Sequence, residues 1–180
     1  MLGRIMPPVA ATVVMLLPPL SGLQMTHATT MRPVSLQKLT EHADMVVQGV
    51  ALERESVWVG QRIFTRVRVR ATDVWVGAAE QDDVLQVWRL GGVVDDLGQR
   101  VPGAAQLPRG KELVLFLTKQ NGRLRCVGMS QGVLNIETEL GVRVPIRPPG
   151  QPLQGGSQPL PKTIEQLKAL VRGYADADAP

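Results

Sequence analysis

The residues most able to do chemistry in this sequence are three arginines spaced two positions apart. Arg66, Arg68 and Arg70 follow Phe64 in the segment 63–75. In an extended chain, residues at this spacing lie on one face, so the arginines form a positive row beside an aromatic ring. Such a row suits the surface of an acidic protein or a glycan. With stacking it also suits single-stranded nucleic acid. A simpler interpretation is a charged, solvated strand edge that discourages aggregation.

Catalytic and metal-binding patterns do not emerge from the remaining polar residues. His42 and Cys126 are far apart in the chain and give no recognisable zinc-ligand spacing. A nucleophile needs a base beside it, and only this pairing would supply one. The acidic pairs at 82–83 and 95–96 lack the spacing of a calcium-binding loop. We therefore predict no catalytic residue, no metal site and no cofactor, although two carboxylates that meet in space remain an open route to hydrolysis.

The segment 91–110 is the longest irregular stretch between predicted strands. It is rich in glycine and proline. A loop of this length in a small domain is often functional, or it forms a small hairpin of its own. Together with the arginine row it supplies the candidate contact residues, which are Phe64, Arg66, Arg68, Arg70, Asp95, Asp96 and Arg100.

The arginine row must be positioned by a strand, because the intervening residues are apolar or β-branched. Ile63, Thr65, Val67, Val69 and Ala71 alternate with the row, and a period of two predicts a strand with one buried face. Further strands are predicted over residues 44–55, 83–90, 111–118, 123–128, 131–137 and 142–146, the last after a turn at 139–140. Residues 56–62 are predicted as a turn.

Two features predict how these strands are arranged. Gly49 interrupts an apolar strand and indicates a bulge or bend. The glycine-rich turns between short strands indicate a sandwich or a barrel. We therefore predict a mainly all-β fold, a small, partly open β-barrel of the OB type with five to seven strands. A short helix over 35–43, capped by Ser35, precedes it.

The ends of the chain differ from the centre. Arg4, an apolar run over 9–17 and the small residues ending at Ala28 are typical of a signal peptide. We expect cleavage near Ala28, which removes one basic residue and no acidic one from a chain of net charge +4. The mature protein is then expected outside the cytoplasm, secreted or periplasmic. No segment is long enough to span a membrane as a helix.

These features divide the 180 residues into six predicted parts. They are a signal peptide (1–28), a leader with a short helix (29–42), the barrel domain (43–145), a Pro/Gly-rich linker (146–161), an amphipathic helix (162–173) and a disordered tail (174–180). Gly173 is predicted to stop the last helix. Hydrophobic residues make up 44% and charged residues 20% of the chain, which is the composition of a globular protein.

Several short motifs carry a resemblance to known proteins. They resemble a family of exported bacterial proteins of uncharacterised function, and their order is similar to the netrin-like OB domain of tissue inhibitors of metalloproteinases, over about residues 43–137. The motifs are ADMVVQGV at 43–50, T-x-V-x-V at 65–69, W-x-G at 75–77, GG at 91–92, GKE-x-V-x-FL at 110–117 and G-x-x-QG at 128–132.

This resemblance implies the barrel and a link with extracellular proteases. The inhibitors chelate the protease zinc through an N-terminal cysteine and are rich in disulfides, whereas this chain has one cysteine, Cys126. The inhibitory residues therefore have no counterpart here. We predict a secreted, non-enzymatic binding module whose partner is an extracytoplasmic protein such as a protease. The alternatives are an accessory or inhibitor of an exported protease and, in a different class, a hydrolytic enzyme. One aromatic in the row and the expected export argue against nucleic acid.

Overall fold

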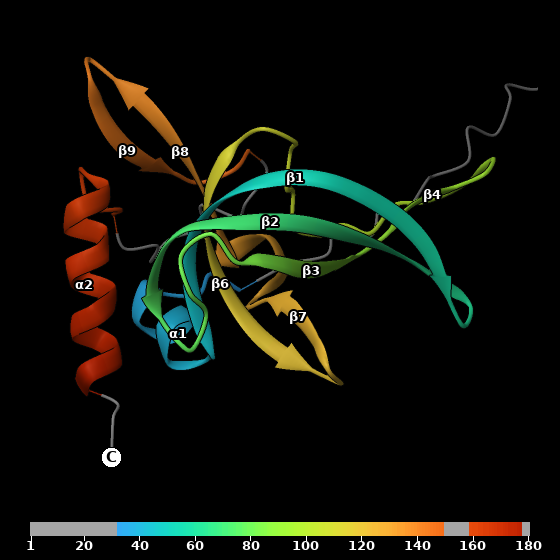
Figure 1. Cartoon of the computed structure of the whole chain (residues 1–180), viewed down its shortest axis with the longest axis horizontal. Coiled ribbons are helices and arrows are strands. Elements are labelled where there is room, and N and C mark those ends of the chain that lie inside the picture. Colours follow the sequence, from blue (N-terminus) through green and yellow to red (C-terminus); the bar gives the residue numbers. More distant parts are fainter. Residues whose placement is uncertain (1–31, 150–158, 178–180) are drawn as a thin grey trace, which may run out of the picture.

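The computed structural model describes residues 32–149 and 159–177. The described chain is mostly β-strand, with one short helix before the strands and a longer helix after them (Figure 1). The elements are α1 (Leu36–Glu41), β1 (Met45–Val59), β2 (Arg62–Val76), β3 (Val84–Leu90), β4 (Gly92–Val94), β5 (Leu97–Gln99), β6 (Glu112–Gln120), β7 (Arg123–Cys126), a 3₁₀ turn (Met129–Gly132), β8 (Val133–Glu139), β9 (Val142–Ile146) and α2 (Ile164–Ala177).

Five strands close into a ring. The sheet order is β1-β2-β3-β7-β6-β8-β9, and β1 also pairs with β6, so β1, β2, β3, β7 and β6 surround a common interior. All neighbours in the ring are antiparallel except β3 and β7, which are parallel and pair only at Val87 and Leu124. The predicted small, partly open barrel is therefore confirmed, and its weakest closure lies between β3 and β7.

The interior of the ring and its outer side form two separate cores. Val47 on β1 and Leu115 on β6 face the interior. Their chain neighbours Val46 and Phe116 face outward and pack with the helices α1 and α2. Strands that are covered on both sides need apolar residues at successive positions, which explains the nearly continuous apolar run in β1 and the unbroken one in β6.

Strand β2 confirms the predicted alternation. Its inward residues Ile63, Val67 and Val69 are buried, whereas Arg68 and Arg70 are exposed. β2 pairs with β1 on one side and β3 on the other. The arginine row is therefore on the outer surface of the barrel, as the period of two predicted.

Gly49 lies at a register shift of β1 against β2, as the predicted bulge required. A Cβ at this position would lie 2.6 Å from the carbonyl oxygen of Arg70. The strands approach too closely here for a side chain, which is the physical reason for glycine.

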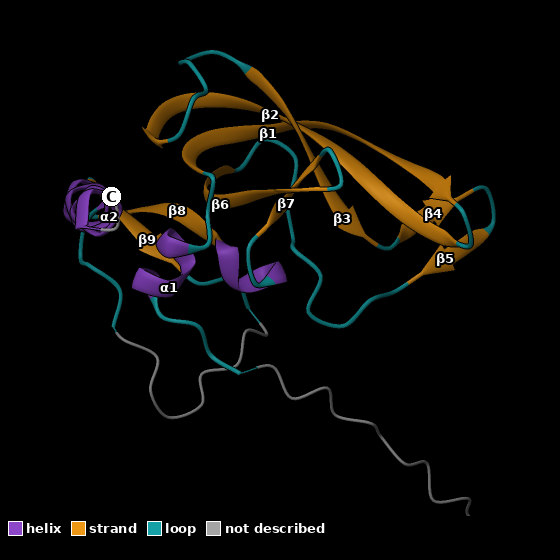
Figure 2. Cartoon of the chain, turned by 90° about the horizontal axis from the view of Figure 1, so that it is seen from below, coloured by secondary structure: helices purple, strands orange, loops and turns teal. Residues whose placement is uncertain are grey.

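The turn region between the first two strands is shorter than predicted. Residues 56–59 and Arg62 continue β1 and β2, and only Gly60 and Gln61 form the turn. Trp58 is half exposed on this strand extension. The residues of β1 and β2 remain paired up to the turn. Cross-strand hydrogen bonds therefore extend both strands to the end of this two-stranded hairpin. Figure 2 shows this end opposite the helices, beside β4 and β5.

The segment 91–110 contains the small hairpin β4–β5, which was one of its two predicted forms. Three boundaries elsewhere differ from the prediction. β8 starts after a 3₁₀ turn, at Val133, and the turn into β9 falls at 140–141. The prediction that Gly173 stops the C-terminal helix is wrong, because α2 continues to Ala177 and Tyr174 packs against the outer core. Helix therefore replaces the predicted disorder over 174–177.

The remaining predictions concern the cap of the first helix, the signal peptide, the linker and membrane spans. Ser35 caps α1, accepting a hydrogen bond from the backbone N–H of Lys38. The signal peptide and the central part of the linker lie outside the described residues. No helix within 32–149 and 159–177 is long and apolar enough to cross a membrane.

Candidate functional site

The outer face of β2, β3 and β7 brings together two aromatic rings and three arginines. Phe64 and Arg66 project outward from β2, and Arg66 pairs across the sheet with Trp88 on β3. The parallel pairing of Val87 with Leu124 sets β7 beside β3, so that Arg123 and Arg125, which alternate with Leu124, reach the same face. We call these residues the arginine–aromatic cluster; they are Phe64, Arg66, Trp88, Arg123 and Arg125.

The rings at the centre of the cluster meet edge to face. Their centroids are 6.3 Å apart and their planes are inclined by 68°. The guanidinium carbon of Arg123 lies 4.7 Å from the Trp88 centroid and 6.0 Å from that of Phe64. Arg66 lies 5.7 Å from Trp88, and Arg125 lies 5.5 Å from Phe64. Each contact of this kind contributes about 0.5–1 kcal/mol at an exposed site, so the rings hold the arginines in place without neutralising them.

Acidic residues compensate only part of this charge. Arg66 forms an ion pair with Glu55 on β1, and Arg68 forms a longer one, 3.4 Å, with Glu53. Exposed ion pairs contribute about 0–1 kcal/mol and are screened by salt. Arg123 has no acidic partner among the described residues, and the same holds for Arg125. The β7 side of the cluster therefore presents positive charge to solvent.

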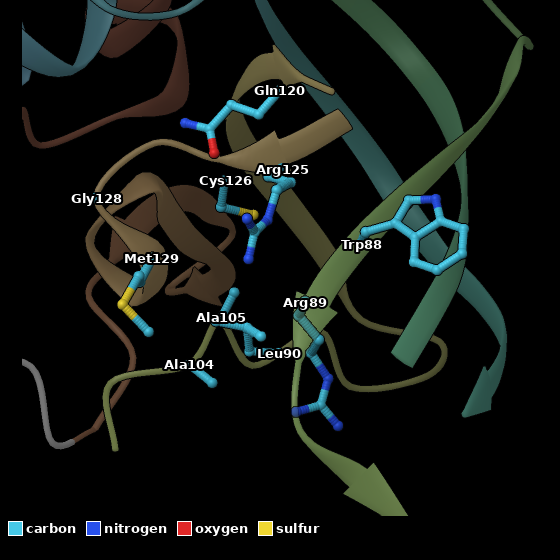
Figure 3. A pocket seen from close by; sticks show the side chains of 10 residues that line it. All are labelled: Trp88, Arg89, Leu90, Ala104, Ala105, Gln120, Arg125, Cys126, Gly128 and Met129. Carbon is cyan, nitrogen blue, oxygen red and sulfur yellow. The ribbon is translucent and has the colours of Figure 1, made fainter. Parts of the chain in front are cut away.

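A pocket opens beside the cluster, where β3 and β7 diverge. We call it the seam pocket; its volume is about 240 Å³, and it is lined by Trp88, Arg89, Leu90, Ala104, Ala105, Gln120, Arg125, Cys126, Gly128 and Met129 (Figure 3). Its walls come from two strands that pair only once, from the end of β6 and from the segments 104–105 and 128–129. Figure 3 shows the Arg125 guanidinium beside Cys126.

Cys126 contributes an apolar wall rather than a nucleophile. It packs against the interior core with Leu124, which lies two positions away on the same side of β7. Burial raises the pKa of the Cys126 thiol to about 12, and the nearby charge of Arg125 offsets this only in part. A thiol with such a pKa stays protonated at neutral pH, and the thiolate is the reactive form.

The candidate residues of the long loop lie away from the cluster. Asp95 and Asp96 form the exposed turn between β4 and β5, with Asp95 at a φ of 50°. Arg100 lines a second pocket at the base of that hairpin. Of the seven residues predicted from sequence, the structure thus brings Phe64 and Arg66 into the cluster and leaves the others outside it.

Three members of the cluster were missed in the sequence. Arg123 and Arg125 alternate with Leu124 and Cys126 directly after the Asn-Gly turn, which is a local signal of an outward face. The pairing of β7 with β3 has no local signal in the sequence, because β4, β5 and β6 lie between the two strands in the chain. Trp88 was assigned to a strand, but its neighbours on the surface come only from this pairing.

Metal-ligating groups do not gather in the part of the chain that the structure describes, where no three His, Cys, Asp or Glu side chains come together. The Nδ1 atom of His42 lies 2.7 Å from the carbonyl oxygen of Lys38 at the end of α1. The ring is thus engaged by its own helix.

Comparison with known proteins adds no family. No protein-family model matches the chain, and no curated protein matches it either. The functional argument therefore depends on the geometry of the cluster and of the pockets.

Proposed function

We propose that this protein is a non-enzymatic binding module that acts outside the cytoplasm and contacts an acidic protein through the arginine–aromatic cluster. The observation that carries the proposal is the packing of three guanidinium groups around the rings of Phe64 and Trp88. Tryptophan and arginine dominate the binding energy of protein interfaces, where they act as anchors.

The cluster combines order with uncompensated charge. Contact with the rings limits the motion of the long arginine side chains, so less conformational entropy is lost when a partner binds. Arg123 and Arg125 retain donors that match the carboxylates of an acidic surface. A row of charges that served only solubility would require neither the rings nor their edge-to-face packing.

The position on the barrel supports the same proposal. OB-type barrels bind their ligands on the face of the second and third strands, and β2 and β3 supply Phe64, Arg66 and Trp88 here. The opposite outer surface, on β1 and β6, is covered by α1 and α2. The cluster face is thus available while the apolar face is occupied by the chain itself.

The test is affinity capture from the culture supernatant of the source cells, with the purified chain as bait. We expect one acidic protein to bind, with affinity that falls as salt rises. Truncation of a central anchor, Trp88→Ala or Arg123→Ala, should weaken binding by about 2 kcal/mol, roughly 30-fold. Arg70→Ala is the matched control, because Arg70 is exposed on the same face but makes no contact with the rings.

The partner distinguishes the alternatives. An exported protease that is captured alone and inhibited would favour the inhibitor function implied by the resemblance. Binding that survives both Trp88→Ala and Arg123→Ala would refute the role of the cluster.

A further inference from the structure

Arg89 occupies the side of β3 opposite to the arginine–aromatic cluster. It follows Trp88 in the strand and pairs with Thr65, an inward residue of β2 that is buried. Figure 3 shows the side chains of Trp88 and Arg89 leaving the strand in different directions. Strand alternation therefore places a guanidinium group on the inner side of the sheet, near the end of the barrel where the β4–β5 hairpin packs.

Two pockets adjoin at this residue. The seam pocket, of about 240 Å³, and a larger one of about 440 Å³, which we call the hairpin pocket, share Arg89, Leu90 and Ala104. Arg125 adds a second guanidinium to the first pocket, and Arg100 adds one to the second. None of the described residues that line either pocket is acidic.

The Arg89 guanidinium lacks a counter-charge. No described residue forms an ion pair with it, and none accepts a hydrogen bond from it. Burial lowers the pKa of Arg89, and repulsion from Arg54 lowers it further. A half-buried guanidinium next to another positive group is unfavourable for folding, and an anion would relieve both effects.

From this arrangement we propose that Arg89 anchors a binding site for a small ligand that carries a carboxylate or a phosphate group. Arg89 and Arg100 hold the anionic group in the hairpin pocket, and the uncharged part of the ligand enters the seam pocket. The planar fork of arginine matches the two oxygens of either group. Leu90, Ala104 and Ala105 give the seam pocket an apolar part beside its arginines, and this part suits a short hydrocarbon chain.

The anchor of this site, Arg89, is not part of the surface proposed for the protein partner, although the seam pocket shares Trp88 and Arg125 with that surface. The Arg89 guanidinium is stacked on neither ring of the cluster, so an Arg89 variant leaves the ring contacts of that surface in place. Loss of small-ligand binding with unchanged partner capture would therefore concern this site alone, and the reverse result would concern the cluster alone.

The experiment is a titration of the purified chain with four probes: inorganic phosphate, acetate, butanoate and hexanoate. Binding is followed through the arginine Nε–H and backbone amide signals in ¹H–¹⁵N NMR spectra. We expect saturable shifts of the Arg89 Nε–H signal and of the amides of Ala104 and Ala105, with Kd values on the order of 1 mM or below. An affinity that rises from acetate to hexanoate identifies a carboxylate with an apolar chain; tighter binding of phosphate than of all three carboxylates identifies a phosphate.

Three variants decide between a binding role and a structural role for Arg89. Arg89→Met should weaken binding at least tenfold, because it removes two charge-assisted hydrogen bonds. Arg89→Lys should give an intermediate affinity, since lysine keeps the charge but not the fork. Arg70→Met removes the same charge from an exposed position on the outer face and should change affinity less than twofold.

Stability without ligand supplies the second readout. Because Arg89 is unpaired, Arg89→Met should leave the unfolding midpoint in anion-free buffer unchanged or raise it. A clearly lower midpoint, or failure of both Arg89 variants to fold, would assign Arg89 to the structure and overturn the proposal. So would the absence of saturable binding up to roughly 50 mM of any probe, or equal binding by the wild type and Arg89→Met.

Discussion

Gly49 offers the sharpest test of the barrel, because its substitution by alanine adds one methyl group where β1 and β2 lie too close for a side chain. The strand is paired there on both sides, with Ala71 of β2 and Leu113 of β6. An added Cβ would lie 2.6 Å from the carbonyl oxygen of Arg70 and 2.9 Å from a methyl carbon of Val69. The first contact is with the backbone of a strand held by its own pairing, so the clash cannot be relieved by a rotamer change.

The expected effect of Gly49→Ala is destabilisation by about 1–3 kcal/mol, the usual cost of overpacking. The gain from a less flexible unfolded chain, about 0.4–1 kcal/mol, offsets part of the clash. For a chain of this length the clash alone corresponds to a fall of about 2–12 °C in Tm, and the offset makes the observed fall smaller. Urea unfolding followed by circular dichroism measures it, with an unchanged m-value as evidence that the denatured state is the same.

Gly173→Ala is the control that makes this result specific. Gly173 lies inside α2, and a Cβ there would meet nothing within 4 Å. The same substitution should therefore stabilise the protein by about 0.5–1 kcal/mol. If Gly49→Ala left the free energy of unfolding unchanged while Gly173→Ala raised it, the close approach of β1 and β2 at the bulge would be refuted.

Two further predictions concern titratable groups. Hydrogen bonds from the backbone N–H of Lys119 and from the Thr118 hydroxyl lower the pKa of Asp44 below its usual 3.8; such a carboxylate adds stability above pH 3.8 and loses it as pH falls through the lowered pKa. Asp44→Asn should thus lower Tm at pH 7 and lower it less at pH 2, and an equal Tm difference at both values would contradict this. Because the pKa of Cys126 is raised to about 12, iodoacetamide at pH 8 should label it slowly in the folded protein and fast in denaturant, as mass spectrometry would show. Fast labelling of the folded protein would refute the raised pKa.

The barrel could be predicted because its signals are local. The alternation of residues 63–71 records which side of β2 is buried, and Gly49 marks the bulge. The apolar runs in β1 and β6 are also typical of strands covered on both faces, and the two cores supply that coverage. The alternation of apolar and polar residues within one strand shows which of its sides is buried. This information is enough to identify each strand and its buried face.

The candidate sites could be predicted only in part, because they depend on which strands become neighbours. Phe64 and Arg66 were identified from their own strand, whereas Trp88 and Arg123 meet only through the single pairing of β3 with β7. The end of α2 was misjudged for a related reason. Gly173 is a poor helix former, but Tyr174 beyond it packs on the outer core, and that packing outweighs the local preference.

The residue types on the outer surface of the barrel differ between the strands that the helices cover and those that they leave exposed. This difference supports the proposed contact role of the exposed strands. The outer sides of β1 and β6 carry residues such as Val46 and Phe116, which the helices cover. The outer sides of β2, β3 and β7 carry rings and arginines instead. An aromatic ring left at the surface loses the free energy that its burial would provide, on the order of 2 kcal/mol. The arginines cover the rings only in part. A surface that served solubility alone would gain nothing from Trp88, whereas a surface that a partner buries recovers this free energy on binding.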